Sequence, residues 1–131
     1  MTDRPPEELV ELAHRMLDLA RDGAAEQLLA YVDAGVPVDL TDAQGNTLLM
    51  LAAYHGHAEV VSGLAGRGAD VDRLNDRGQS PLAGALFKGA DDVVAVLVAR
   101  GADLDSGAPT ARETAAFFGR SLGTEPDLPH T

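Results

Sequence analysis

Two short stretches of the chain carry side chains that could do chemistry. The first is GADVDRLNDRG at residues 68–78, where three Asp and one Asn offer the oxygen ligands that hard cations prefer. Its spacing differs from the twelve-residue calcium loop, and it lacks that loop's terminal bidentate Glu. The second is HGH at residues 55–57, because imidazole titrates near neutral pH and binds metals. Alternate residues of a helix do not share a face, so the two rings are not expected to meet.

No other motif points to catalysis. The chain has no Cys, and no Ser stands with a His and an acid in a recognisable local pattern. The segment GRGAD at residues 66–70 is too short for a phosphate loop and lacks its Lys-Ser/Thr pair. The sequence therefore predicts a protein that is not an enzyme and that holds no metal and no cofactor.

Length and charge restrict the class of protein and its partners. A chain of 131 residues with 45% hydrophobic residues is long enough for one globular domain and too short for two. The formal net charge of -11 repels nucleic acid and anionic membrane surfaces. No stretch approaches the ~18 apolar residues of a membrane span, so we expect a cytoplasmic protein. The preference for Arg over Lys, with abundant Ala, Gly and Val, is consistent with a GC-rich bacterial genome.

One repeating step along the chain organises the sequence. The interval from Gly35 to Gly68 is the same as the interval from Gly68 to Gly101. This step joins further pairs of identical or similar residues, namely Gly45 and Gly78, Thr47 and Ser80, Leu49 and Leu82, Ala52 and Ala85, Gly56 and Gly89, Val60 and Val93, Val61 and Val94, and Leu64 and Leu97. Self-similarity at a fixed period is typical of proteins built from stacked supersecondary units.

The acidic residues of the first stretch belong to this repeat. Asp39, Asp72 and Asp105 recur at the same step beside expected turns. Asp42 and Asn75 are also separated by one step. Asp and Asn side chains at turns commonly hydrogen-bond their own backbone. We therefore interpret these side chains as structural and not as metal ligands.

Each unit is expected to contain two helices and a protruding turn. Thr47, Ser80 and Thr110 each precede a short apolar run and are suited to cap the N-terminus of a helix. Thr110 and Glu113 also fit the S/T-x-x-E capping box. Later in the unit, apolar residues recur at i, i+1 and i+4 and indicate a second helix.

The repeated segments resemble ankyrin repeats. GNTLLMLAAYHGHAEVVSGLAGRGADVD at residues 45–72 and GQSPLAGALFKGADDVVAVLVARGADLD at residues 78–105 are similar to the family pattern of G-x-T-P-L-H-x-A-A, then G-H, an apolar pair and G-A-D-V-N. The resemblance implies an all-α solenoid of about four helix-turn-helix repeats joined by β-hairpin-like loops. Its expected bounds are repeats at about 5–41, 42–74, 75–107 and a truncated 108–120, in one domain at 1–120, with a flexible C-terminal tail at 121–131.

Aromatic side chains mark the expected binding surface. Tyr54 and Phe87 are one period apart near the ends of inner helices, and Phe117 follows after a shorter step. In the ankyrin family this position faces the concave surface, whose residues vary with the partner. The resemblance therefore implies a protein-binding site formed by the aromatic residues and the polar positions around them, namely Tyr54, His55, Phe87, Lys88, Phe117, Phe118, Gln44, Asn46, Asp76, Arg77 and Gln79.

The expected function is non-catalytic recognition of another protein, as an adaptor or regulator. Tyr and Phe bury a large area at low entropic cost and are typical of interface hot spots. The same rings could instead pack against one another and the next hairpin, so internal packing is an alternative. A second functional hypothesis rests on charge, since an acidic chain could inhibit a basic protein electrostatically. The truncated last repeat is compatible with a monomer or with weak self-association there.

Overall fold

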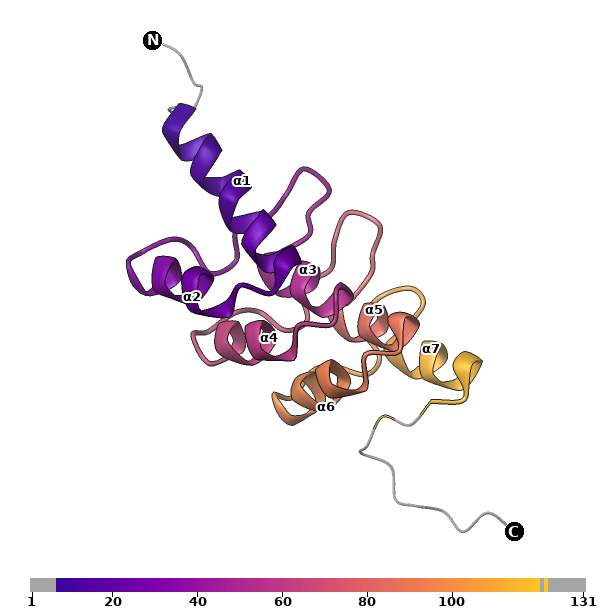
Figure 1. Ribbon diagram of the computed structural model, residues 1–131. Coiled ribbons are helices and arrows are strands. Elements are labelled where there is room, and N and C mark those ends of the chain that lie inside the picture. The colour runs from indigo at the N-terminus through magenta and orange to yellow at the C-terminus, as the bar shows by residue number, and fades with distance from the viewer. Residues whose placement is uncertain (1–6, 121, 123–131) are drawn as a thin grey trace, which may run out of the picture.

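Seven α-helices form the part of the chain that the structure describes (Figure 1). The computed structural model describes residues 7–120 and residue 122. The helices are α1 (Glu7–Asp22), α2 (Ala25–Asp33), α3 (Leu48–Tyr54), α4 (Ala58–Ala65), α5 (Pro81–Lys88), α6 (Asp91–Ala99) and α7 (Ala111–Phe118). Within these described residues, extended pairing is limited to an isolated antiparallel bridge between Thr41 and Thr47. The predicted all-α repeat architecture is confirmed.

The predicted capping residues begin three of the helices. The Thr47 and Ser80 hydroxyls each accept a hydrogen bond of 3.1 Å from the backbone N–H of the third residue that follows. Thr110 and Glu113 form the complete capping box at the start of α7. All three predicted N-caps are therefore confirmed, and each satisfies a donor that the first turn of a helix leaves unpaired.

The helices form the two layers of a solenoid (Figure 1). Helices α1, α3, α5 and α7 contact one another in chain order and make the inner layer, while α2, α4 and α6 make the outer layer. Within each pair, the inner helix also contacts the outer helix that follows it. The loops that lead back to the inner layer project to one side of the molecule (Figure 1). This arrangement places the equivalent positions of successive repeats side by side.

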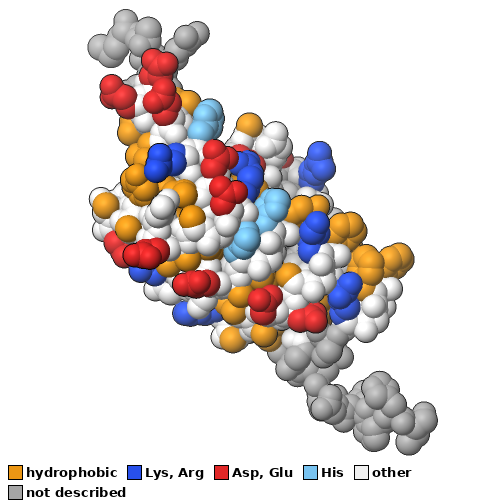
Figure 2. Space-filling view, in the orientation of Figure 1, with side chains coloured by type: hydrophobic (Ala, Val, Ile, Leu, Met, Phe, Trp, Pro, Cys, Tyr) orange, Lys and Arg blue, Asp and Glu red, His pale blue; other side chains and the backbone are white. Residues whose placement is uncertain are grey.

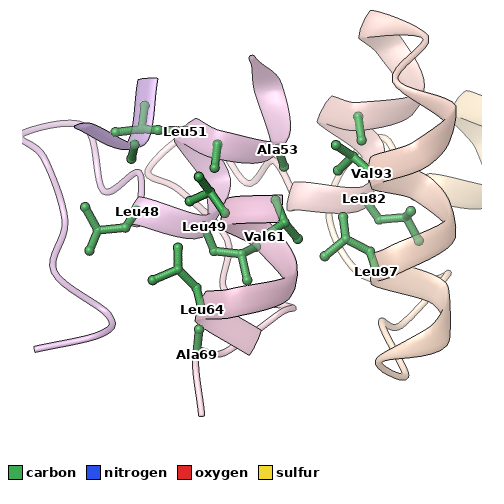
Figure 3. Close-up of a cluster of buried hydrophobic side chains, with 14 of the residues drawn as sticks. Leu48, Leu49, Leu51, Ala53, Val61, Leu64, Ala69, Leu82, Val93 and Leu97 are labelled. Carbon is green, nitrogen blue, oxygen red and sulfur yellow. The ribbon is translucent and has the colours of Figure 1, made fainter. Parts of the chain in front are cut away.

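A continuous apolar core lies between the two layers. Leu49 and Leu82 are one repeat apart and at most 1% exposed, and Leu64 and Leu97 are both fully buried. Figure 3 shows these four side chains in one cluster that extends from α3 and α4 to α5 and α6. Burying each such side chain stabilises the fold by about 1.5–3 kcal/mol relative to leaving it exposed. Apolar residues one period apart in the sequence thus occupy equivalent positions in the core.

Two Asx side chains hold the hairpin-like loops as predicted. Asp42 Oδ1 accepts hydrogen bonds of 2.9 Å from the backbone N–H groups of the second and fourth residues after it. Asn75 Oδ1 accepts the equivalent bonds at 3.0 Å in the next loop. These bonds close each loop on itself and explain why the two positions recur in the sequence.

The remaining repeated acids do not bind their own loops, and that part of the prediction is wrong. Asp39 Oδ1 accepts a hydrogen bond of 3.1 Å from the backbone N–H of Asp70 in the next repeat. Asp72 Oδ1 accepts the equivalent bond of 2.7 Å from Asp103. Asp105, in the last of these loops, accepts a hydrogen bond from an arginine side chain of α7. Stacking brings the backbone of the next loop within reach of Asp39 and Asp72, which spacing inside one repeat cannot reveal.

The two ends of the chain are described only in part. Residues 1–6 and the expected tail at 121–131 lie outside the described residues, with the exception of Leu122. Leu122 is 5% exposed and belongs to the buried core cluster. This leucine therefore contributes to the core at the C-terminal end of the solenoid.

Candidate functional site

A groove crosses the inner helices and the loops that precede them. Its volume is about 940 Å³, and its lining comes from α3, α5 and α7, the end of α1, and the loops. Figure 2 shows exposed hydrophobic side chains interspersed with Lys and Arg on the side of the molecule where α5 and α7 lie. The groove therefore coincides with an apolar and partly basic part of the surface.

Four aromatic side chains line the groove and remain exposed to solvent. The exposed fractions are 41% for Tyr54, 57% for Phe87, 82% for Phe117 and 39% for Phe118. The Phe118 ring packs edge to face against Phe87 and Phe117, with centroid distances of 5.8 and 5.0 Å. Such a pair contributes about 0.5–1.5 kcal/mol beyond its area burial. Ring packing thus accounts for part of this surface and leaves large apolar areas in contact with water.

Tyr54 is flanked by two nitrogen-bearing side chains. The Lys88 Nζ lies 4.8 Å from the centroid of the Tyr54 ring, and the His55 ring meets Tyr54 edge to face at 5.6 Å. A cation over an exposed aromatic face is worth about 0.5–1 kcal/mol. The contact between Lys88 and Tyr54 joins the end of α5 to the end of α3 and holds a cation beside the aromatic surface.

The predicted polar site residues fall into two groups. Those that line the groove with the four rings are Gln44, Asn46, His55, Arg77 and Gln79. Asp76 and Lys88 lie outside the lining. The backbone N–H of Asp76 donates a 2.9 Å hydrogen bond to the Gln44 carbonyl, which joins two successive loops. The groove therefore has an apolar centre and a polar edge along the loops.

Sequence reasoning missed the base of the groove. Its buried or small residues include Met50, Ala83 and Gly84, and the other lining residues not predicted are Arg21, Asp42, Leu51, Asn75, Pro109, Glu113 and Thr114. Helical spacing in the sequence could have predicted the residues at the base of the groove. Met50 and Ala83 each lie four residues before a predicted ring, so they lie on the same face of their helices.

The two histidines of the HGH segment stack, so the prediction that their rings do not meet is wrong. His55 caps the end of α3 and His57 caps the start of α4, with Gly56 at a φ of 79° between them. Their ring centroids are 6.5 Å apart, with an interplanar angle of 19°. His57 Nε2 lies 2.6 Å from the carbonyl oxygen of Arg21, a contact between repeats. The turn at the glycine removes the helix geometry on which the prediction depended.

His55 lies in cationic surroundings. Partial burial of the ring is the main cause that lowers its pKa. The positive charges of His57, Lys88 and Arg21 lower the pKa of His55 further, and Asp22 opposes them more weakly. The folded protein therefore favours the neutral form of His55.

Replacing His55 with Gln is expected to reduce the loss of stability in mild acid. The pKa of His55 is lower in the folded state than its unfolded value of about 6.5. Its contribution to the free energy of unfolding is therefore present above the unfolded pKa and is lost as the pH falls through the folded pKa. Wild type should therefore lose more unfolding free energy than His55→Gln between about pH 7.5 and about pH 5. Urea denaturation at both pH values measures this difference. His14→Gln, an exposed histidine of α1, is the control, and equal losses in wild type and His55→Gln would contradict the prediction.

Residues 7–120 and 122 offer neither a metal cluster nor a membrane-spanning helix. No group of three His, Asp or Glu side chains in this part of the chain could hold a metal ion. No described helix has both the length and the apolar character needed to cross a bilayer. Within the stretch at 68–78, the carboxylates of Asp70 and Asp72 accept backbone hydrogen bonds.

Stacked helix pairs with capped inner helices and a groove across the inner layer define a helical repeat scaffold. Residues 16–108 match the family described as ankyrin repeats in three copies. The chain belongs to the ankyrin repeat family. Ankyrin repeats are generally protein–protein interaction modules, and the family is typically non-catalytic.

A bacterial protein is similar to part of this sequence. An ankyrin repeat protein of Pseudomonas aeruginosa is 45% identical to the chain over 65 residues. The match covers 47% of this chain and 38% of that protein. The chain therefore spans well under half the length of this curated relative.

Proposed function

We propose that the groove docks another protein and that the chain acts through it as a non-catalytic adaptor or regulator. The observation that carries this proposal is the concentration of exposed aromatic rings in the groove. The chain has only two Tyr and three Phe, and four of these five residues line it. Exposed rings that converge on one concave surface are the usual anchors of protein interfaces.

The anatomy of the groove supports the same function. An apolar centre is bordered by the side-chain amides of Gln44, Asn46 and Gln79, which matches the apolar core and polar rim of ordinary interfaces. The groove extends over the inner helices of a short solenoid, so its proposed occupant is an extended segment or a small surface feature of the partner.

Helix α7 is proposed to be the inner helix of a fourth, truncated repeat at residues 108–120. Its Phe117 is 82% exposed and is the most open ring of the groove. The same ring offers a surface for weak self-association, which sedimentation over a range of concentrations measures. A partner docked in the groove would cover this ring, so the proposed function predicts that the chain is a monomer at the concentrations where the partner binds.

Tyr54→Ala/Phe87→Ala is expected to weaken partner binding by about thirtyfold or more and so to reduce partner recovery, because a single hot-spot ring contributes roughly 2 kcal/mol or more. The measurement is affinity purification from the native host, with wild type and variant as baits and mass spectrometry as the readout. The two rings are 41% and 57% exposed, and the variant loses their contacts with Lys88 and Phe118, so its urea midpoint should fall modestly while far-UV circular dichroism verifies that it is folded.

Leu9→Ala/Leu74→Ala is the matched control for this experiment. It also removes two exposed apolar side chains, which are 56% and 41% exposed and lie outside the groove lining. Its recovery of the partner should equal that of wild type. Equal recovery from the aromatic variant would remove the groove from consideration as the docking site.

A further inference from the structure

The groove is less acidic than the whole chain, because its lining holds two Arg against one Asp and one Glu. The sequence has 21 Asp and Glu against 10 Lys and Arg. In Figure 2 the acidic side chains gather over α1 and along the edge formed by the outer helices, with some Lys and Arg among them, and further Lys and Arg accompany the exposed hydrophobic side chains near α5 and α7. A ligand in the groove therefore meets a different electrostatic environment from a ligand elsewhere on this face.

The acids in the groove lining are occupied by bonds within the fold. Both carboxylate oxygens of Asp42 accept hydrogen bonds from its own loop, and Oδ2 also lies 3.9 Å from Arg21 Nη2. Glu113 accepts a hydrogen bond from the backbone N–H of Thr110, which lowers the pKa of Glu113 and keeps its charge in the capping box. Neither carboxylate is therefore well placed to recruit a basic ligand.

The cations around the rings are available. Among the residues that the structure describes, neither Arg77 nor Lys88 pairs with a carboxylate. Lys88 lies over the Tyr54 ring, and the guanidinium carbon of Arg120 lies 5.4 Å from the centroid of the Phe118 ring. Each end of the aromatic surface thus has a cation against it. The lowered pKa of His55, caused in part by neighbouring positive charges, is consistent with this field.

We propose that the groove selects an extended segment that presents apolar side chains together with carboxylates. The apolar side chains would lie on the rings, and the carboxylates would pair with Arg77 and Lys88. This inference rests on the proposed docking function and specifies the chemistry of its ligand. It also reverses the charge-based hypothesis, in which the acidic chain attracts a basic partner.

The spacing of the rings sets the period of such a segment. Adjacent packed helices lie about 8–10 Å apart, so equivalent positions on α3 and α5 are expected at a similar separation. A polyproline-like chain rises about 3.1 Å per residue and returns to the same face every third residue, about 9 Å further on. Apolar side chains at every third position of an extended ligand can therefore reach successive rings.

Three fluorescein-labelled nonapeptides test this preference at about 0.15 M salt, where charges farther than about 8 Å are largely screened. They repeat Leu-Asp-Pro, Leu-Asn-Pro or Leu-Lys-Pro, so they share apolar content and an extended form and differ in charge. Fluorescence anisotropy with the full chain should give about tenfold tighter binding of the acidic peptide than of the basic one.

Arg77→Glu/Lys88→Glu should remove or invert this order. Arg15→Glu/Arg73→Glu makes the same change in net charge at exposed positions outside the groove lining and should preserve it. Urea midpoints verify that both variants are folded. Persistence of the acidic preference in Arg77→Glu/Lys88→Glu would overturn the assignment of these two cations.

The other outcomes separate this inference from the proposed function. Equal binding of all three peptides that is lost in Tyr54→Ala/Phe87→Ala would retain docking in the groove and refute the charge preference. Tightest binding of the basic peptide, or binding of none of them, would overturn the inference. In the last case the recovery experiment with the native host still judges the docking function independently.

Discussion

Leu82→Ala is expected to lower the free energy of unfolding by about 2–5 kcal/mol. Leu82 is 1% exposed on α5, and Figure 3 places it in the core cluster with Val93 and Leu97. The substitution removes apolar contacts and leaves a cavity in a repeat that stacks on neighbours at both sides. Domains are commonly stable by only about 5–15 kcal/mol, so this is a large share of the total. Urea denaturation followed by far-UV circular dichroism measures the change.

Leu74→Ala is the control for this prediction. Leu74 is 41% exposed in a loop, and its truncation should change the free energy of unfolding by less than about 0.5–1 kcal/mol. Because the slope for urea is about 1–3 kcal/mol per M, the midpoint of Leu82→Ala should fall by roughly 1–2 M relative to the control. Indistinguishable midpoints would show that the core of this repeat contributes little to the fold.

The fold was predictable because its determinants repeat locally. Thr47 and Ser80 stand at the same position of two repeats, and their capping bonds involve residues within one helical turn. Leu49 and Leu82 likewise mark one core position twice. Contacts between repeats were not predictable in the same way. The bond from Asp39 Oδ1 to the Asp70 backbone depends on the exact stacking of two loops, which no spacing within the sequence encodes.

The candidate site was predictable to the extent that it follows the period. Tyr54 and Phe87 are one step apart and both line the groove. Arg21 also lines it and lies one step before Tyr54, so alignment by period could have found it, but a search for aromatic residues at this position passes over an arginine. The available cations Arg77 and Lys88 are recognisable only from the structure, because the sequence does not tell which charges are already paired.

Filling the base of the groove at Gly84 is expected to separate binding from stability. Gly84 lies inside α5, and a Cβ added there would come no closer than 3.8 Å to Met50 Sδ and Tyr54 Cδ2. Glycine in a helix interior costs about 0.5–1 kcal/mol relative to alanine, so Gly84→Ala should raise the free energy of unfolding by that amount. A longer side chain at the same position would extend into the groove, where solvent now lies against the rings.

Gly84→Leu is therefore expected to weaken partner binding by about thirtyfold or more, since it occupies the space that a ligand needs beside two hot-spot rings. Its urea midpoint should stay close to that of wild type, because a Cβ at this position meets Met50 Sδ and Tyr54 Cδ2 at an ordinary van der Waals distance and leucine improves helix propensity. Ala95→Leu adds a leucine at an exposed position of α6, outside the groove lining, and should leave partner recovery unchanged. Normal partner binding by a folded Gly84→Leu protein would mean that the ligand does not enter the groove. A lower midpoint would instead mean that the base of the groove is already filled by packing, which would contradict the geometry at Gly84.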